Sequence, residues 1–538
     1  MPAERPHGRP LGVVYTPREV AEPMVRVALA PLIAGRTAAE LLALRVCDPA
    51  IGEGAFLVEV VRVIAEALRA AWQREGTARD DAEHAVASHC IAGVDIDPRA
   101  VEIARQTVGC TTLRVGDALA LDWDGGFDAV VGNPPYIRQE QLAAHKPALA
   151  AFEVYDGVAD LYVYFVELAH RLLRPGGRYC LITPNKWLTA AYGRPLRTFL
   201  AARGSVEGLV DLSCAPVFRD ADAFACIVWG RTGPPLATPI HAARIAPGRS
   251  VAAALADAAH PQQRARWHAE PWHVDAPDDR ALIDRLERTW PTLGSLVGRP
   301  TRGVVTGYNR AFVIDRERRA QLLADDPACA AWIRPFVKGR DLGRWHARPG
   351  ERFVLLVDRG STPPAAITAH LAQFRPALEP RTPGAAIGRK PGRYRWYELQ
   401  DPVGALAASP APRLLYQDIQ AGPACCLDDQ ALVPDTTVWM LPTDDRYLLA
   451  ILNSPLYGWY ARRRFPPALG GAVRPKLAYI RALPIATPAP DLRRHIVGLV
   501  DRQLARDGDP AALDDALADA VGEAYALSRD ERQLAIGS

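Results

Sequence analysis

The sequence is organised around the stretch Asp128-Ala129-Val130-Val131-Gly132-Asn133-Pro134-Pro135-Tyr136. It predicts an apolar strand that runs into a stiff turn. The two prolines fix two φ angles and remove two backbone donors, and Pro134 keeps Asn133 out of the helical region. Asn133 adds an amide oxygen, and Tyr136 adds an aromatic face. This combination suits the binding of a planar group that carries an NH2, although the four residues Asn133 to Tyr136 alone fit a plain loop equally well.

Length and composition indicate a globular protein of two or three domains. The chain has 538 residues, of which 49% are hydrophobic and 23% charged, and its net charge is +3. A nearly neutral total neither demands nor excludes nucleic acid, because a local basic face can exist within it. Nine scattered cysteines without a Cys-x-x-Cys pair indicate a reducing compartment, and the histidines lack metal-ligand spacing. We therefore expect a cytoplasmic protein with no membrane segment and no metal.

An acidic residue is expected at the end of the first strand of an α/β domain. Residues 44–58 predict a strand into Asp48, a turn with Gly52 and Gly54, and a helix. Glycines let a ligand approach the backbone closely, but Leu57 stands where the third glycine of a dinucleotide-binding fingerprint belongs. An acid before this turn would repel a phosphate and suits a ligand with a cationic amine. The pattern favours S-adenosylmethionine over NAD.

Two further acids follow at predicted strand ends. Asp95 ends the second strand, where ribose hydroxyls are bound in such domains, and Asp97-Pro98 predicts a helix N-cap and first helical position. Asp117 follows the third strand, where an adenine amine could be bound. Thr16-Pro17 predicts a helix start, with Thr16 as the N-cap and Pro17 at the first helical position. With further alternating segments up to about residue 230, these elements predict a seven-stranded α/β domain.

The first half resembles the N6-adenine DNA methyltransferases of the TaqI-type (gamma) group. The motifs that carry the resemblance are Tyr15-Thr16-Pro17, Asp48-Pro49-Ala50-Ile51-Gly52-Glu53-Gly54, Gly93-Val94-Asp95-Ile96-Asp97, Gly116-Asp117, Asn133-Pro134-Pro135-Tyr136, Asp160-Leu161-Tyr162 and Pro184-Asn185-Lys186-Trp187. The resemblance implies a Rossmann-like, seven-stranded domain that binds S-adenosylmethionine.

The resemblance also implies roles for individual residues. It implies a cofactor site formed by Tyr15, Thr16, Asp48, Pro49, Ala50, Gly52, Gly54, Asp95, Ile96, Asp117 and Ala118. It implies that Asn133 and Pro134 hold the adenine amine, followed by Pro135, and that Tyr136 stacks on a flipped-out base. Phe218 occupies the place of the aromatic residue that stacks on the other face, and Phe224 is close enough in sequence to compete.

The second half resembles the C-terminal target-recognition domain of the same enzymes. The proline-rich residues 231–239 predict a linker, so we expect domains at residues 1–236 and 240–490 and a helical tail at 491–538. The recognition domain is expected to be α+β. Its basic clusters predict phosphate contacts, although a solvated loop is the default interpretation of such runs. The predicted DNA-binding residues are Lys338, Arg340, Arg389, Lys390, Arg393, Arg462 and Arg464.

These features predict a site-specific adenine methyltransferase that acts on double-stranded DNA as a monomer, and they allow a separately encoded restriction endonuclease as a partner. Two alternatives remain open. The Asn-Pro-Pro-Tyr motif also serves enzymes that methylate RNA adenine or a protein glutamine amide. A DNA-recognition subunit without catalysis is the other alternative, although every expected motif is present.

Overall fold

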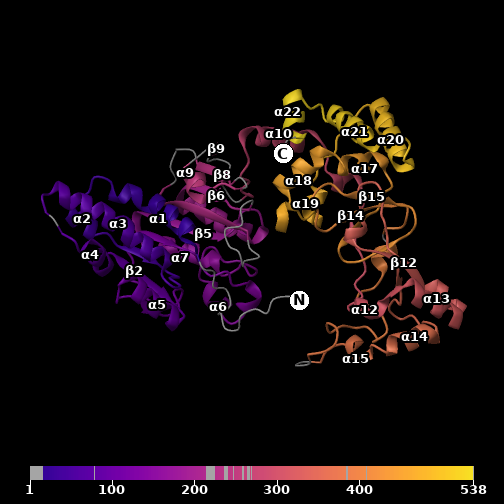
Figure 1. Cartoon of the computed structure of the whole chain (residues 1–538), viewed down its shortest axis with the longest axis horizontal. Coiled ribbons are helices and arrows are strands. Elements are labelled where there is room, and N and C mark those ends of the chain that lie inside the picture. The colour runs from indigo at the N-terminus through magenta and orange to yellow at the C-terminus, as the bar shows by residue number, and fades with distance from the viewer. Residues whose placement is uncertain are drawn as a thin grey trace. The chain divides into compact units, whose positions relative to one another are not determined.

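The computed structural model describes residues 16–536, except for 78, 214–223, 235–239, 246–247, 257–259, 263–266, 268–269, 383–385 and 408. The chain divides into two compact units, Met1–Pro277 and Asp278–Ser538. The ribbon in Figure 1 follows the chain through both units. No helix in the described part of the chain is long and apolar enough to cross a membrane.

The first unit is built on a nine-stranded sheet with the order β3-β2-β1-β4-β5-β7-β6-β8-β9. The strands are β1 (Val46–Asp48), β2 (Ile91–Asp95), β3 (Arg114–Val115), β4 (Phe127–Gly132), β5 (Leu173–Pro184), β6 (Gly204–Asp211), β7 (Ala225–Thr232), β8 (Ile240–Arg244) and β9 (His260–Gln262). Strands β1 to β5 run parallel to one another, whereas β7 runs antiparallel between β5 and β6. The predicted Rossmann-like fold is confirmed.

Helices cover both faces of this sheet because successive strand residues are buried on opposite sides. Ala129 and Val131 pack with the core that holds α1 (Arg18–Ile33), α2 (Ala38–Leu42), α3 (Ala55–Arg74), α4 (Ala82–His89), α5 (Pro98–Val108) and α9 (Val251–Ala256). Val130 packs with the opposite core, which holds α7 (Tyr162–Leu172) and α8 (Arg194–Arg203). The short α6 (Lys146–Leu149) lies between β4 and α7 in the chain.

The first unit extends beyond the boundary expected from the sequence. β8 pairs in parallel with β6, from Gly208 opposite His241 to Asp211 opposite Arg244. The sheet thus continues after the proline-rich stretch at 231–239, of which residues 235–239 lie outside the described part. The sequence places the end of this unit about forty residues too early, because the pairing partner of β8 is not visible from local composition.

The second unit contains two four-stranded sheets. The first has the order β10-β17-β14-β15 and comprises β10 (Thr301–Arg302), β14 (Arg413–Gln417), β15 (Cys425–Asp428) and β17 (Val438–Leu441). The second has the order β11-β13-β12-β16 and comprises β11 (Val313–Asp315), β12 (Ile333–Val337), β13 (Arg352–Leu355) and β16 (Val433–Pro434). The expected α+β architecture is confirmed.

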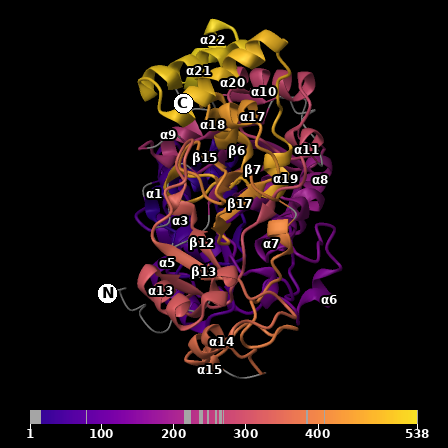
Figure 2. The same ribbon diagram turned by 90° about the vertical axis from the view of Figure 1, so that its right-hand side faces the viewer.

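Helices complete the second unit. They are α10 (Pro277–Thr289), α11 (Leu293–Leu296), α12 (Asn309–Phe312), α13 (Arg316–Asp325), α14 (Ala365–Ala372), α15 (Arg375–Leu378), α16 (Gly404–Ala407), α17 (Arg446–Leu452), α18 (Pro455–Arg464), α19 (Leu477–Arg481), α20 (Pro490–Ala505), α21 (Pro510–Ala524) and α22 (Arg529–Ile536). The last three form the predicted helical tail. They gather beside α17 and α18 and share one hydrophobic core with them (Figure 2).

The described cysteines are free thiols and all are buried. Cys47, Cys90, Cys110, Cys180 and Cys226 belong to the first unit, and Cys329, Cys425 and Cys426 to the second. The ninth cysteine of the sequence, Cys214, lies outside the described residues.

Candidate active site

Parallel strands bring the predicted acids and Asn133 to one edge of the sheet. β1 lies between β2 and β4, with Asp48 opposite Gly93 and Val46 opposite Ala129. The order of the strands reverses between β1 and β4, and in open α/β sheets the crevice at such a reversal is where ligands bind. Asp48, Asp95 and Asn133 thus follow the carboxyl ends of three adjacent strands.

Asp48 is a fully buried carboxylate with one oxygen left without a partner. Its Oδ1 accepts a hydrogen bond from the Ala50 backbone N–H at 2.9 Å, whereas Oδ2 has no hydrogen-bond partner among the described residues. Burial raises the pKa of Asp48 to about 7, the Ala50 N–H opposes this shift, and the charge of Asp95 adds to it. The orphan oxygen fits a cationic donor.

The turn after β1 is tied to the end of β2. The Gly52 N–H donates to Asp95 Oδ2 at 2.9 Å, and the Asp97 N–H donates to Asp95 Oδ1 at 3.0 Å. A carboxylate offers about four acceptor positions, so Asp95 keeps acceptors for ligand hydroxyls. Gly54 has a φ of 92° at the N-cap of α3, a conformation that favours glycine. Asp97 caps α5 with Pro98 at the first helical position, as predicted.

Two residues flank these acids with surfaces that suit an aromatic ring system. Ile96 is 73% exposed beside Asp95, and Ala118 is buried after the third strand. Asp117 accepts a hydrogen bond from the Leu119 N–H at 3.0 Å and therefore closes its own turn. The arrangement provides apolar contact next to acceptors at the strand ends.

Asn133 holds a second buried oxygen without a partner. Its Nδ2 donates to Thr16 Oγ1 at 3.1 Å, but its Oδ1 makes no hydrogen bond to any described residue. Helix α1 begins at Arg18 with Pro17 at the N-cap position, so Thr16 is not the cap that the sequence predicts. Thr16 instead supports the amide of Asn133.

The prolines of the motif lead directly into an aromatic cluster. Pro134 is buried, and Pro135 and Tyr136 are partly exposed. The ring of Tyr136 meets that of Tyr162 edge to face, with centroids 6.4 Å apart. Burial raises the pKa of Tyr136, so its hydroxyl stays neutral. Tyr15 and Phe218, which are also predicted site residues, lie outside the described residues.

Asp211 is a site-supporting residue that the sequence reasoning missed. It is buried at the end of β6, accepts from Asn185 Nδ2 at 3.0 Å and pairs with Arg244 at 3.1 Å. The Asn185 N–H in turn donates to the Phe224 carbonyl at 2.8 Å, which fixes the Phe224 backbone beside the end of β5. An acid at the end of a predicted strand was the available signal.

The basic residues predicted to bind DNA fall into two groups. Arg340, Lys390 and Arg393 are exposed, and Lys338 and Arg462 are partly exposed. Arg389 is only 2% exposed, with its guanidinium bound by backbone carbonyls, and Arg464 is buried and pairs with Glu287 at 3.1 Å. A guanidinium group that is buried and already bound to protein oxygens, as both of these are, cannot reach a phosphate. Arg389 and Arg464 are therefore corrected to structural residues.

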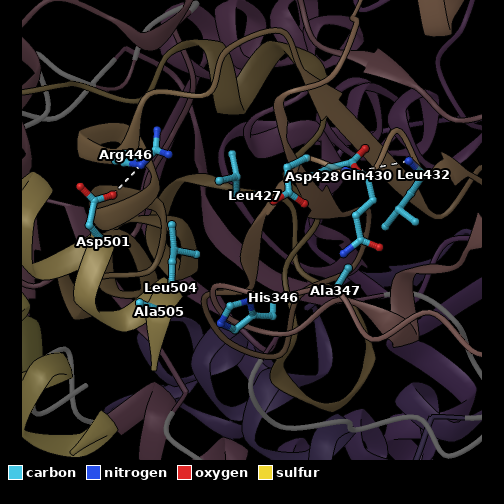
Figure 3. Close-up of a pocket in the computed structure, with 11 residues that line it drawn as sticks. His346, Ala347, Leu427, Asp428, Gln430, Leu432, Arg446, Asp501, Leu504 and Ala505 are labelled. Atoms are coloured by element: carbon cyan, nitrogen blue, oxygen red, sulfur yellow. Dashed lines mark hydrogen bonds and ion pairs between the residues drawn. The ribbon is translucent and has the colours of Figure 1, made fainter. Parts of the chain in front are cut away.

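A cavity lies in a different part of the molecule. It measures about 400 Å³ in the second unit and is lined by His346, Ala347, Leu427, Asp428, Asp429, Gln430, Leu432, Arg446, Asp501, Leu504 and Ala505 (Figure 3). Its charged walls are largely paired internally: Arg446 binds Asp501 at 2.6 Å, and Asp428 binds Arg413 at 3.1 Å. None of the predicted site residues lines this cavity. Across the described residues there is also no cluster of three potential metal-binding side chains.

Comparison with known proteins supports the resemblance seen in the sequence. Residues 113–218 match the Eco57I restriction-modification methylase family, and residues 334–485 match the TaqI-like C-terminal specificity domain. With the fold, these matches make the chain similar to methyltransferases of restriction-modification systems, and they place a methylase match before a specificity-domain match.

Individual relatives show the same similarity. The chain is 28% identical over 552 residues to the Type II methyltransferase M.PaeR7I of Pseudomonas aeruginosa, covering 92% of this chain and 89% of that protein. The solved structure of the Type IIL restriction-modification enzyme MmeI in complex with DNA matches 96% of this chain and 76% of its own, with a TM-score of 0.64 at 14% identity, which shows a shared fold. A release factor glutamine methyltransferase of Streptomyces coelicolor is 50% identical, but only over 74 residues, or 12% of this chain and 26% of that protein.

Proposed function

We propose that the chain transfers a methyl group from S-adenosylmethionine to the N6 amine of an adenine in double-stranded DNA. The observation that carries the proposal is the buried Asn133 Oδ1, which lacks a hydrogen-bond partner among the described residues. A buried acceptor left unsatisfied costs about 1–3 kcal/mol, so its persistence is typical of a group that serves a ligand. An exocyclic amine supplies the matching donor.

The residues present fit the cofactor. Asp48 Oδ2 is a second buried acceptor without a described partner, and it suits the cationic amine of the methionine part. Asp95 suits the ribose hydroxyls, and Ile96 and Asp117 suit the adenine ring and its amine. Thr16, Pro49, Ala50, Gly52, Gly54 and Ala118 complete the proposed site, together with Tyr15. The bound cofactor supplies an electrophilic methyl group on a sulfonium.

The proposed chemistry depends on positioning rather than on a strong base. The lone pair of an adenine amine is delocalised into the ring and is a poor nucleophile. Asn133 Oδ1 and the Pro134 carbonyl accept its two hydrogens and draw them out of the ring plane, which localises the lone pair on nitrogen. The nitrogen–methyl bond forms as the sulfur–methyl bond breaks, and one amine proton leaves to solvent. Fixed acceptors of this kind stabilise the developing charge without reorganisation.

The target adenine must leave the base stack to reach this site, at a cost of a few kcal/mol. Stacking on an aromatic ring returns about 1–3 kcal/mol per base. Tyr136 supplies one face of this stack in our proposal. Phe218 or Phe224 supplies the other, and the placement of the Phe224 backbone beside Asn185 favours neither, because Phe218 lies outside the described residues.

The alternatives rank below DNA adenine methylation. The similarity to a release factor glutamine methyltransferase spans 74 residues, or 12% of this chain. The specificity-domain match covers residues 334–485, a longer stretch than that whole similarity. A purely recognising subunit has no need of two orphan acceptors at the strand ends. A restriction endonuclease partner and a monomeric enzyme remain part of the proposal.

The test is methyl transfer by the purified full chain with labelled S-adenosylmethionine. Unmodified bacterial genomic DNA, an adenine-rich RNA and a release factor protein serve as parallel substrates, and nucleoside analysis identifies the product. We expect N6-methyladenine in DNA alone. Label in cytosine, in RNA or in the protein would contradict the proposal, as would DNA binding without any transfer.

A further inference from the structure

The segment 381–397 is a strongly basic part of the second unit. It contains Arg381, Arg389, Lys390, Arg393 and Arg395 and no Asp or Glu. It follows α15, which is labelled in Figure 1. Four of the five cations are exposed, and Arg389 alone is buried. The exposed cations therefore lie on a segment that needs internal contacts to keep its conformation.

Arg389 closes two consecutive loops at their common base. Its backbone N–H donates to the Glu379 carbonyl and its carbonyl accepts from the Arg381 N–H, both at 2.9 Å, which joins Arg381 to Arg389. Its guanidinium donates to the carbonyls of Arg395, Trp396 and Glu398, which closes residues 390–398. We call the described residues between 381 and 397 the loop pair.

The guanidinium of Arg389 is fully satisfied. Its remaining bonds go to the carbonyls of Leu378 at 2.7 Å and Thr306 at 2.9 Å, so all five N–H donors are used. It also lies over the ring of Tyr394, 4.3 Å from its centroid. A buried cation that has no carboxylate bonded to it among the described residues is costly unless its hydrogen bonds are complete, as they are here. Arg389 thus fixes the bases of both loops.

The exposed side chains of the loop pair carry unpaired charge. Arg381, Lys390 and Arg393 make no side-chain hydrogen bond or ion pair to the described residues, whereas Arg395 is occupied by the Tyr397 hydroxyl at 2.8 Å. Ile387 is 68% exposed between them, one of the most exposed large apolar side chains in the described part of the chain. Free cations around an exposed apolar side chain are complementary to the phosphates and groove of a duplex.

We propose that the loop pair is a DNA-contacting element in which Arg381, Lys390 and Arg393 bind phosphates, Ile387 enters the groove and Arg389 is the positioning residue. This inference rests on the proposed function, because duplex DNA is its partner. It replaces the sequence-based assignment of Arg389 to phosphate contact with an internal role, and it adds Arg381 and Ile387.

The test is the salt dependence of binding to a labelled duplex of random sequence. Neutralising Arg381, Lys390 and Arg393 together to Gln should reduce the log–log slope by about 0.9 for each lost phosphate contact. Arg316→Gln is the matched control, because Arg316 is exposed in the same unit but already paired with Glu351 at 2.8 Å. An unchanged slope in the triple variant would overturn the phosphate assignment.

Arg389→Lys separates positioning from general destabilisation. Lysine has three donors instead of five and cannot close both loops, so we expect a smaller slope with unchanged cofactor affinity. Adding Arg389→Lys to the triple variant should cause no further reduction of the salt slope, since Arg389 acts on that slope through the three exposed cations. Additive losses would show that Arg389 acts elsewhere.

Ile387→Ser should lower methyl transfer on unmodified genomic DNA several-fold while the salt slope stays constant, and unchanged transfer would exclude a groove contact. The inference and the proposed function fail in distinguishable ways. Wild-type binding to duplex DNA without methyl transfer overturns the proposed function alone. An insensitive triple variant overturns the loop pair alone, and absence of wild-type duplex binding overturns both.

Discussion

The nitrogen and the oxygen of the Asn133 side-chain amide lie in different environments. Thr16 holds the nitrogen end, and the oxygen end is buried without a described partner. We expect Asn133→Ala to lower kcat at least about 100-fold, in the range seen when one preorganised hydrogen-bonding group is removed. Cofactor affinity, measured by calorimetry, should change little because Asp48 and Asp95 remain. Wild-type turnover in this variant would rule out the proposed mechanism.

Asp48 makes the site dependent on pH. Its folded-state pKa is raised to about 7 from 3.8, so the stability it contributes is present below pH 3.8 and is lost as the pH rises through 7. Asp48→Asn should therefore raise the Tm of the cofactor-free chain at pH 8, by about 2–4 °C for each kcal/mol recovered, and should change it little at pH 3.5.

The same substitution should act oppositely on cofactor binding. Wild-type affinity should increase between pH 6 and pH 8 as the carboxylate forms, and Asp48→Asn should bind weakly with a flatter profile. Asp122→Asn is the control, because Asp122 is an exposed acid of the same unit. If calorimetry shows equal affinity for the Asn variant and the wild type, the cationic amine is bound elsewhere.

At the scale of elements, the sequence predicts the β-turn-α units well and the buried cations poorly. Asp48, Asp95 and Asn133 could be placed together because the carboxyl ends of parallel strands share one edge. Arg389 and Arg464 stand in basic runs that are indistinguishable, as sequence, from exposed ones. The structure shows that Arg389 is internal, because its guanidinium donates to the carbonyls of Leu378, Thr306 and Glu398. None of these residues is adjacent to Arg389 in the sequence, so the basic run alone does not indicate these contacts.

The packing of β4 against β1 allows a test of this edge. A Cβ at Gly132 would lie 2.6 Å from Asp48 Oδ1, with Asp48 itself buried. We expect Gly132→Ala to displace the Asp48 carboxylate. The folding equilibrium constant and the affinity for S-adenosylmethionine should each fall tenfold or more. Gly157→Ala should be nearly neutral, since the nearest atom to its Cβ would be the Tyr155 hydroxyl at 4.0 Å. Thermal melts and calorimetry on both variants decide the matter.

At the scale of the molecule, the division at Pro277 and Asp278 changes how the chain should be cut. The composition of residues 231–239 suggests a linker, yet β8 and β9 extend the first sheet beyond it. Such a pairing is set by the sheet edge that β6 offers, and no local pattern in residues 240–262 reports it.

We expect a fragment of residues 1–277 to fold and bind S-adenosylmethionine without selecting a DNA site. A fragment ending at residue 240 should melt at a lower temperature, because β6 loses its partner β8. A fragment of residues 278–538 should retain salt-dependent DNA binding. The measurement is the protection of genomic DNA from competitor binding. If the first fragment alone selected a site, our assignment of recognition to the second unit would be wrong.

The buried thiols of the two units can report separately on the transient opening of each unit. Burial shields the described cysteines, and it raises the pKa of Cys90, Cys226 and Cys426 to about 12, which keeps these three thiols protonated. Once Cys214 is replaced by Ser, a thiol reagent can modify the remaining eight only during transient opening. Peptide mapping then assigns each modified cysteine to its unit. The factor by which S-adenosylmethionine slows labelling in the first unit would measure how strongly the cofactor suppresses transient opening of that unit. The factor by which DNA slows labelling in the second unit would measure the same for DNA.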